Sequence, residues 1–294
     1  MTIELARYNP LRRVLSYDDF DRGVNGWCEL CGNHDGDLDT VRPSFGDLRP
    51  PQLSTVPFFD IGSHGAMTGT YALKLATRPR AGHTACLIKR LTLADEALVQ
   101  FETYFAAKPE ARQGNGVYAD RGWDGNEDPS EYDLGAFTLS NDIGRFDGSR
   151  YHCALRYQNT TVDGELVQGW YYKTSLQPTT KMQLVGQVPN GDFHTLSDDD
   201  WQPVPGGQGP LCFNEVPTKV NWHYLRWQVD TKAGRNVELQ VNDRVMDLRD
   251  IDVPVYPHPY TGLRGLFNLL LDVRTHRDVR NFLFLDSCVI SADW

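Results

Sequence analysis

The clearest pattern in the chain is a strict alternation of apolar and polar side chains in the segment Val-Gln-Phe-Glu-Thr-Tyr-Phe, which begins at residue 99. Phe101 and Phe105 fall on one face of this segment, and the carboxylate of Glu102 and the phenol of Tyr104 fall on the other. Successive side chains of a β-strand point to opposite faces, so the pattern predicts a strand with one face in a core. Its polar face could line a wet groove.

Similar patterns predict most of the remaining regular structure. Residues 11–27 hold an apolar strand followed by an acidic turn, and further strands are predicted at residues 69–75, 84–93, 134–139, 151–158, 167–174, 223–230, 237–242, 266–273 and 282–290. Polar stretches rich in Gly and Pro predict long loops at residues 28–62, 108–132 and 176–220. No long helical stripe is visible, so we predict an all-β sandwich with long loops.

One hairpin can be placed in register. Asp163-Gly164 lies between two alternating runs, which is a strong hairpin signal. If these residues form a two-residue turn, Arg156 pairs with Tyr171, and opposed residues share a face. His152 and Lys173 then lie on the same face as this pair. The other face is mainly aromatic and apolar and consists of Tyr151, Cys153, Leu155, Tyr157, Trp170 and Tyr172.

Composition supports this fold class and argues against some classes of binding partner. The 26 glycines, 17 prolines and an aromatic fraction of 11% favour strands and turns over helices. A length of 294 residues suits one large sandwich, so we predict a single domain over residues 1–294. The net charge of -10 repels phosphate backbones and anionic membranes, which argues against nucleic acid and membrane surfaces as partners.

The N-terminus and the cysteines indicate the cellular compartment in which we expect the protein. Residues 1–13 lack the apolar stretch of a secretory signal, and no apolar run reaches the roughly 18 residues that suggest a membrane span. Four of the six cysteines fall in strand-like patterns, where a free thiol packs as a small apolar group. We therefore expect reduced thiols and a cytoplasmic protein.

Several short segments together resemble a known superfamily. They are Tyr17-Asp18-Asp19-Phe20, Gly26-Trp27, and the stretches at residues 69–75, 222–230 and 284–291. In this order they resemble the concanavalin A-like lectin/glucanase superfamily, and the chain looks like a bacterial family of about this length within it. The resemblance implies a jelly-roll β-sandwich of two antiparallel sheets that binds carbohydrate on a concave sheet.

Members of that superfamily include lectins, glycoside hydrolases, polysaccharide lyases and sugar-binding modules. The paired-acid motif of the laminarinase-like hydrolases is missing here, and so are the motifs of the alginate-lyase-like members. The resemblance therefore carries over no catalytic residue, and fold alone does not choose among these activities.

The polar faces of two predicted strands hold the strongest candidates for chemistry. If both strands belong to one sheet, their polar groups converge, with Glu102 or His152 as the base and Tyr104 or Tyr171 as the acid. Arg156 would be the electrostatic clamp. Lys173 and Gln158 complete the predicted substrate contacts. The alternative interpretation is a solvated sheet face with cross-strand salt bridges.

Two basic turns could rim such a groove. The first is surrounded by Arg78, Arg80, His83 and Lys89, and the second by Arg274, His276 and Arg277. If both turns rim the groove, they favour an anionic or hydroxyl-rich ligand. The alternative is that these are ordinary exposed turn residues.

Metal sites are a weaker expectation. Asn33, Asp35, Asp37 and Asp39 occupy every second position, a spacing that is similar to calcium loops but lacks their acidic twelfth residue. A hydrated acidic loop is the alternative. Cys28, Cys31 and His34 have the spacing of half a zinc site without the other half. We expect no required cofactor, although a divalent metal such as calcium could be held for structure.

These observations favour an intracellular enzyme that cleaves a glycosidic bond, by hydrolysis or elimination, in a groove on the sheet. The alternative is a non-catalytic carbohydrate-binding or accessory β-sandwich subunit. Either protein would have a saccharide or glycoside as its ligand, and either could assemble as a homo-oligomer.

Overall fold

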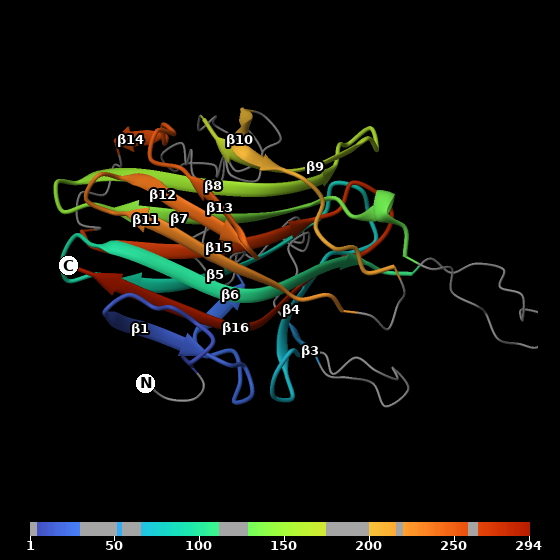
Figure 1. Ribbon diagram of the computed structural model, residues 1–294, viewed down its shortest axis with the longest axis horizontal. Helices are drawn as coiled ribbons and strands as arrows, with labels where there is room; N and C mark the ends of the chain where they lie inside the picture. The colour runs from blue at the N-terminus through green and yellow to red at the C-terminus, as the bar shows by residue number, and fades with distance from the viewer. Residues whose placement is uncertain are drawn as a thin grey trace, which may run out of the picture.

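The computed structural model describes residues 5–29, 52–54, 66–111, 129–174, 200–215, 220–257 and 264–294. Its strands form two stacked antiparallel sheets, and the long strands of both run along the long axis of the molecule (Figure 1). The predicted fold class is confirmed: the protein is a jelly-roll β-sandwich of two antiparallel sheets.

Sheet A holds eight strands. Their order is β13 (Arg244–Asp247), β12 (Arg235–Val241), β11 (His223–Asp230), β6 (Leu98–Pro109), β16 (Asn281–Asp293), β4 (Ala72–Ala76) and β3 (Gln52–Ser54), and β1 (Arg13–Asp18) pairs with β16. The predicted opening strand is therefore the central β6, between β11 and β16 from the C-terminal part of the chain.

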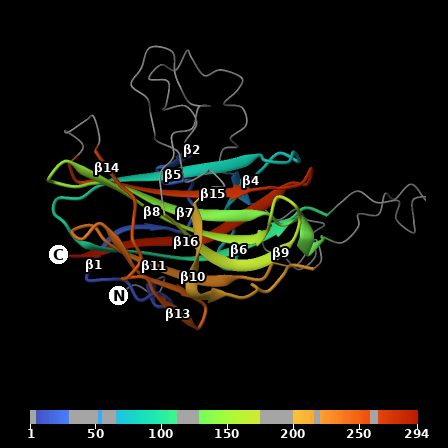
Figure 2. The same ribbon diagram turned by 90° about the horizontal axis from the view of Figure 1, so that it is seen from above.

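Sheet B also holds eight strands. Their order is β10 (Trp201–Gln208), β9 (Leu166–Lys173), β8 (Ser149–Thr160), β7 (Ala136–Gly144), β15 (Leu266–Arg274), β5 (Thr84–Thr92) and β2 (Trp27–Glu29), and β14 (Val255–Pro257) pairs with β8. A short 3-10 helix, η5 (Glu131–Asp133), precedes β7. Figure 2 shows β5, β15, β7 and β8 of this sheet in one layer above β16, β6, β11 and β13 of sheet A.

Aromatic side chains from both sheets form the core. The ring centroid of Phe105 in β6 lies 5.2 Å from that of Phe137 in β7, which joins the two sheets. Phe137 in turn contacts Tyr157 at 5.4 Å and Trp170 at 5.6 Å. Burying each such ring stabilises the fold by about 1.5–3 kcal/mol, so alternation at these positions fixes which face of each strand points inward.

The register of the predicted hairpin is confirmed in its body. Arg156 pairs with Tyr171, and Leu155 pairs with Tyr172. Nearer the loop the register shifts, and Thr160 pairs with Leu166. Gln168 has a φ of +45°, as expected for a bulge that absorbs one residue. The connection is therefore longer than the predicted two-residue turn, although the assignment of faces holds.

The prediction of loop over residues 176–220 is wrong where it covers β10. The sequence of β10 contains two prolines and two glycines, which usually indicate a loop. This strand lies at the edge of sheet B, where a proline has no ladder hydrogen bond to lose. Edge strands tolerate such residues, and sequence pattern alone does not separate them from loops.

Within the described residues, no helix has the length and apolar character needed to cross a membrane.

Candidate functional site

A hollow of about 220 Å³ opens on the outer face of sheet B. It is lined by strand residues of β8, β9 and β10, by the β8–β9 loop and by the turn after β15: Arg156, Gln158, Thr161, Val162, Val167, Tyr171, Trp201 and His276. Side chains alternate along β8: Leu155 and Tyr157 point into the core, so Arg156 and Gln158 point outward. Four predicted site residues are thus brought together here.

Arg156 and Trp201 form one wall of this pocket. The guanidinium carbon of Arg156 lies 4.1 Å from the centroid of the Trp201 ring, and Nε donates to Thr138 Oγ1 at 3.2 Å. Lys173 Nζ lies 5.2 Å from the same ring. A cation over an indole face is an attractive arrangement, and it holds the long side chain of Arg156 in one orientation.

Gln158 and His276 form the second polar wall. Nε2 of Gln158 donates to Thr160 O at 2.5 Å and also lies 3.0 Å from His276 Nε2. A carbonyl oxygen can only accept, so the amide nitrogen must face Thr160, and its second hydrogen then points to the imidazole. His276 Nε2 is therefore the acceptor in this pair, and the Gln158 Oε1 atom is what the amide can offer to a ligand.

The β8–β9 loop forms the rim, and it is tied to the turn that carries His276. Arg277 Nη1 donates to Val162 O at 3.2 Å. Val162 itself is 57% exposed, so an apolar surface stands at the mouth of the pocket beside its polar walls. Tyr171, opposite Arg156, is half-buried at the base of this rim.

The prediction that Glu102 and Tyr104 converge with His152 and Arg156 is wrong. Glu102 and Tyr104 lie on β6 of sheet A, whereas His152 and Arg156 lie on β8 of sheet B. The outward faces of stacked sheets point to opposite sides of the sandwich. Alternation shows which face of a strand is polar, but it does not show to which sheet the strand belongs.

Glu102 has a structural environment of its own. It is completely buried and accepts hydrogen bonds from Asn9 N at 2.9 Å, Gln100 Nε2 at 2.8 Å and the Tyr224 hydroxyl at 2.6 Å. Burial and the bond to Glu102 raise the pKa of Tyr224 well above its usual range. The hydroxyl of Tyr104 donates to Arg7 O at 3.4 Å. These side chains hold the N-terminal segment on sheet A.

We expect Glu102→Ala to lower the free energy of unfolding by about 2 kcal/mol, since three donors lose a charged acceptor. Glu102→Gln keeps an acceptor for Tyr224 and should cost less. Urea unfolding of both variants measures the two losses; equal losses in Glu102→Ala and Glu102→Gln would contradict this role of the carboxylate.

His152 lies on the predicted face but does not line the pocket. It is four residues from Arg156, or about 13 Å along the strand. Its Nε2 is 3.5 Å from Asp142 Oδ1, and Asp142 also binds the Arg150 guanidinium and accepts from Asn268 Nδ2 at 3.1 Å. Burial would raise the pKa of Asp142, but hydrogen bonds from Arg150 and the nearby positive charges outweigh it and lower that pKa.

The two basic turns lie against each other, as an arrangement around one groove requires. Gly82 N donates to Thr275 O at 2.9 Å, and Thr275 N donates to His83 O at 3.1 Å. Of the basic residues named from the sequence at these turns, His276 alone lines the pocket. His83 is buried and accepts from Arg78 N at 3.3 Å.

The other predicted residues of the first turn have different surroundings. Arg80 is exposed on the turn itself. Lys89 is buried and forms an ion pair with Asp18 at 3.1 Å, close to the ring of Trp27. Lys89 thus stabilises the edge of the sandwich rather than the rim of the pocket, and the prediction that it surrounds the turn is wrong.

The predicted calcium residues Asp35, Asp37 and Asp39 lie outside the described residues, as do Asn33, Cys31 and His34. In the part of the chain that the structure describes, no group of three or more His, Cys, Asp or Glu side chains is arranged to hold a metal ion.

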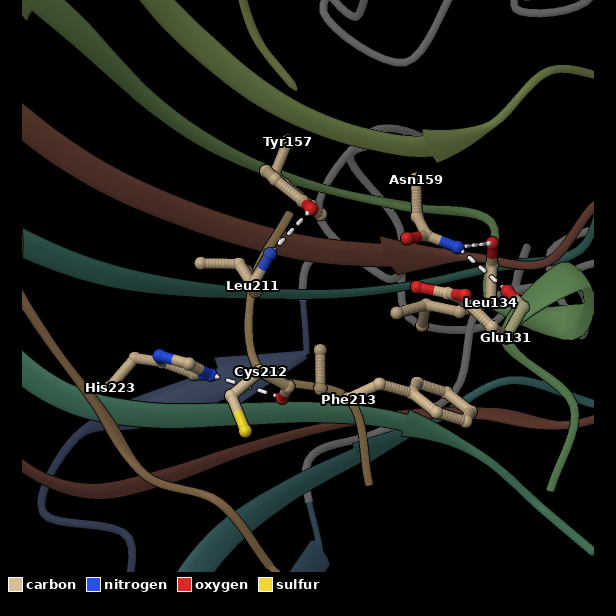
Figure 3. A pocket seen from close by; sticks show the side chains of 9 residues that line it. Glu131, Leu134, Tyr157, Asn159, Leu211, Cys212, Phe213 and His223 are labelled. Atoms are coloured by element: carbon tan, nitrogen blue, oxygen red, sulfur yellow. Dashed lines mark hydrogen bonds between the residues drawn. The ribbon is translucent and has the colours of Figure 1, made fainter. Parts of the chain in front are cut away.

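A much smaller pocket lies at one end of the sandwich, and Figure 3 shows His223, Cys212, Leu211 and Tyr157 around it. Its volume of about 10 Å³ is no larger than one water molecule needs. Asn242 Oδ1 accepts from Tyr224 N at 3.0 Å, so its amide nitrogen faces His223 Nδ1, also at 3.0 Å. His223 Nε2 therefore carries the proton and donates to Cys212 O at 3.4 Å.

This network predicts a pH-dependent stability. Burial lowers the pKa of His223, and a protonated ring would set an N–H against the Asn242 amide. The unfolded chain, with a His pKa of about 6.5, then binds the proton more readily, so stability should fall as the pH drops below that value. Urea unfolding between pH 7 and pH 5 measures the slope, which should be smaller in His223→Gln; an unchanged slope would contradict the assignment.

A family model described as "Domain of unknown function (DUF6772)" matches residues 1–294. The chain belongs to this family. The comparison with curated proteins found no match.

Three solved structures illustrate what the chain is similar to. The potassium-bound carbohydrate recognition domain of Emp46p has 9% identity and a TM-score of 0.36, covering 77% of this chain and 85% of that one. Peanut lectin has 6% identity and a TM-score of 0.40, covering 83% and 89%. A β-1,3-glucanase from Mycobacterium marinum has 10% identity and a TM-score of 0.36, covering 94% and 98%.

These are the lectin and glucanase classes that the sequence resemblance named. The fold itself is assigned from the strand order of this chain, given above.

Sequence reasoning missed two residues that matter most to this face. Trp201 was missed because it lies in β10, whose prolines and glycines led to the prediction of a loop. Asp142 was missed because it falls beyond the end of the predicted strand at residues 134–139; β7 continues through it to Gly144.

Proposed function

We propose that this protein binds a saccharide in the hollow on the outer face of sheet B. The observation that carries the proposal is that one pocket joins an indole ring, a guanidinium, a phenol, an amide and an imidazole. Sugar rings present C–H faces that pack on aromatic side chains, and hydroxyls that both donate and accept hydrogen bonds. A concave site with a few convergent polar groups is what such a ligand requires.

Each wall has a separate part in this proposal. Trp201 supplies the flat apolar surface, and its position is held by Arg156 on one face of the ring. Gln158 supplies an acceptor and Tyr171 a hydroxyl, and the two lie on adjacent strands of the same sheet. Because these groups sit on strands rather than on free loops, little conformational entropy is lost on binding.

Elimination of an acidic glycoside is the catalytic candidate that the lining favours. None of the described residues that line the pocket is Asp or Glu, so a two-carboxylate hydrolysis is not supported. In an elimination a base takes the proton next to the sugar carboxylate, a carbon–carbon double bond forms, and the departing oxygen is protonated. Tyr171 is the group for proton transfer, since His276 Nε2 accepts from Gln158, and Arg156 would stabilise the carboxylate.

The test is a glycan array followed by isothermal titration with each glycan retained, and by a product assay on the same mixtures. Binding with no new reducing end and no unsaturated product supports a binding protein, and an unsaturated product supports the elimination. The matched control is Glu102→Gln, which should bind as the wild type does. If no saccharide is retained by the folded wild-type protein, the proposal is wrong.

A further inference from the structure

Resting on the proposed saccharide function, we infer that Arg277 is a positioning residue for the pocket. Its guanidinium ties the β8–β9 loop, residues 161–165, to the turn after β15, and so holds Thr161 and Val162 where they line the pocket mouth. Arg277 does not line the pocket itself. Its role is to keep the mouth in place and thereby to slow the release of a bound saccharide.

The first argument is the contact between Arg277 and the loop. Arg277 Nη1 donates to Val162 O at 3.2 Å. Within the loop, Thr161 N donates to Glu165 O at 2.9 Å, and Gly164 N donates to Thr161 O at 3.0 Å. The loop is therefore a compact turn that moves as one unit. Among the described residues, Arg277 makes the only hydrogen bond between this unit and the turn after β15.

The second argument is the glycine on which the guanidinium lies. Gly164 has a φ of +91°, which other residues rarely adopt. A Cβ atom at this position would overlap Nη2 of Arg277 and lie 2.9 Å from its Cζ. The guanidinium thus packs against the loop backbone at a point that a larger residue would fill. Gly164, which the sequence marked only as a turn residue, also makes room for the side chain that holds the turn.

The third argument is the anchoring of Arg277 in its own turn. Thr275 is completely buried, and its hydroxyl accepts from Arg277 N at 3.2 Å and donates to Val279 O at 2.7 Å. Between these residues, His276 places Nε2 3.0 Å from Gln158 Nε2 in the polar wall of the pocket. One anchored turn therefore carries both a pocket wall and the tie to the pocket mouth.

This arrangement fixes the distance between the mouth and the wall before a saccharide arrives. Binding then does not have to order the loop, which favours affinity. A loop without the tie would swing away from the wall, and a bound sugar would leave more easily. Because most changes within one binding site alter the dissociation rate rather than the association rate, the effect should appear in dissociation.

Hydrogen exchange of the full-length protein tests the tie without any saccharide. Arg277→Met keeps an unbranched stem and removes the donors, so the amides of residues 161–165 should exchange about tenfold faster, as expected when a hydrogen bond from a charged group is lost. Gly164→Ala should give a similar increase, because the new methyl group displaces the guanidinium. The double variant should exchange no faster than the faster single variant, since both changes remove one contact.

Gly148→Ala is the matched control for backbone strain. Gly148 has a φ of +88°, but no atom lies within 4 Å of an added Cβ. This variant should raise exchange in its own turn by less than Gly164→Ala does in the loop, and it should leave residues 161–165 at the wild-type rate.

Binding kinetics test the role of Arg277 in the pocket. The probes are maltohexaose, cellohexaose, laminarihexaose, chitohexaose and a galacturonic acid hexamer, together with any glycan retained on the array. For each probe that the wild type binds, Arg277→Met should raise the dissociation rate about fivefold or more, with the association rate within about twofold. Arg280→Met is the control, since Arg280 Nη1 pairs with Glu110 at 3.8 Å, and it should change neither rate.

The outcomes separate this inference from the proposed function. Wild-type exchange of the loop in both Arg277→Met and Gly164→Ala would overturn the inference and leave saccharide binding in place. Faster exchange with an unchanged dissociation rate would do the same, because the tie would then have no role in the pocket. If the wild type binds none of the probes, both the inference and the proposed function are wrong.

Discussion

Asp142→Ala should lower the free energy of unfolding by about 3–5 kcal/mol, the cost of removing one member of a buried ion pair. Asp142 is 6% exposed and binds Arg150, which is 9% exposed, through both of its carboxylate oxygens. His152 Nε2 and the Asn268 amide contact the same carboxylate. Removing it leaves a buried guanidinium opposite a buried imidazole, and urea unfolding measures the loss.

Asp147→Ala is the matched control. Asp147 pairs with Arg145 at 2.9 Å, but its side chain is 53% exposed. An exposed pair contributes less than about 1 kcal/mol, so this variant should unfold almost as the wild type does. Similar losses in the two variants would show that the cluster around Asp142 is not the buried ionic unit described here.

The cluster around Asp142 also predicts how the stability of the protein changes with pH. The pKa of Asp142 is lowered in the folded protein, so its contribution to stability is present above the unfolded value of about 3.9. That contribution is lost as the pH falls through the lower folded-state pKa. Asp142→Asn should therefore be less sensitive to acid below pH 4 than the wild type, while being less stable at neutral pH.

Trp201→Ala should weaken saccharide binding by about 30-fold or more, since a central aromatic contact is worth about 2 kcal/mol or more. The indole is the flat surface of the pocket, and it also orients the guanidinium of Arg156. Both functions disappear with the ring. Because β10 is an edge strand, the substitution should leave the sandwich core intact, and circular dichroism together with urea unfolding checks this.

Trp294→Ala is the control for this prediction. Trp294 is 41% exposed, and the guanidinium carbon of Arg13 lies 4.0 Å from its ring, so it repeats the same pair of groups at the end of β16 in sheet A. Its replacement should leave affinity unchanged. An equal loss of affinity in both variants would indicate a general effect of losing a surface tryptophan. An unchanged affinity in Trp201→Ala would contradict saccharide binding in this pocket.

The local sequence pattern was sufficient to predict the strands and to predict which face of each strand points into the core. Alternation placed Phe101 and Phe105 inward and Glu102 outward, and the hairpin rule placed Arg156 opposite Tyr171. These features depend on interactions between residues close in sequence. The grouping of Arg156, Gln158, Tyr171 and His276 also came partly from the sequence, through the shared face and the basic turn.

The assignment of strands to the two sheets could not be predicted from the local sequence pattern. The sequence does not show that β6 pairs with β11 and β16 in sheet A, away from β8 in sheet B. The sequence pattern therefore grouped Glu102 with His152 on one face, although the two residues lie on opposite sides of the molecule. Trp201 was missed for a different reason, because the prolines of β10 are tolerated only by its edge position, which is itself a property of the whole sheet.

A crystal structure of the protein with a bound oligosaccharide, chosen from the retained glycans, would show where the saccharide lies. We expect a sugar ring packed on Trp201, with hydrogen bonds to Arg156 and Gln158. A sugar bound instead on the outer face of sheet A, over Tyr104 and Tyr224, would contradict it.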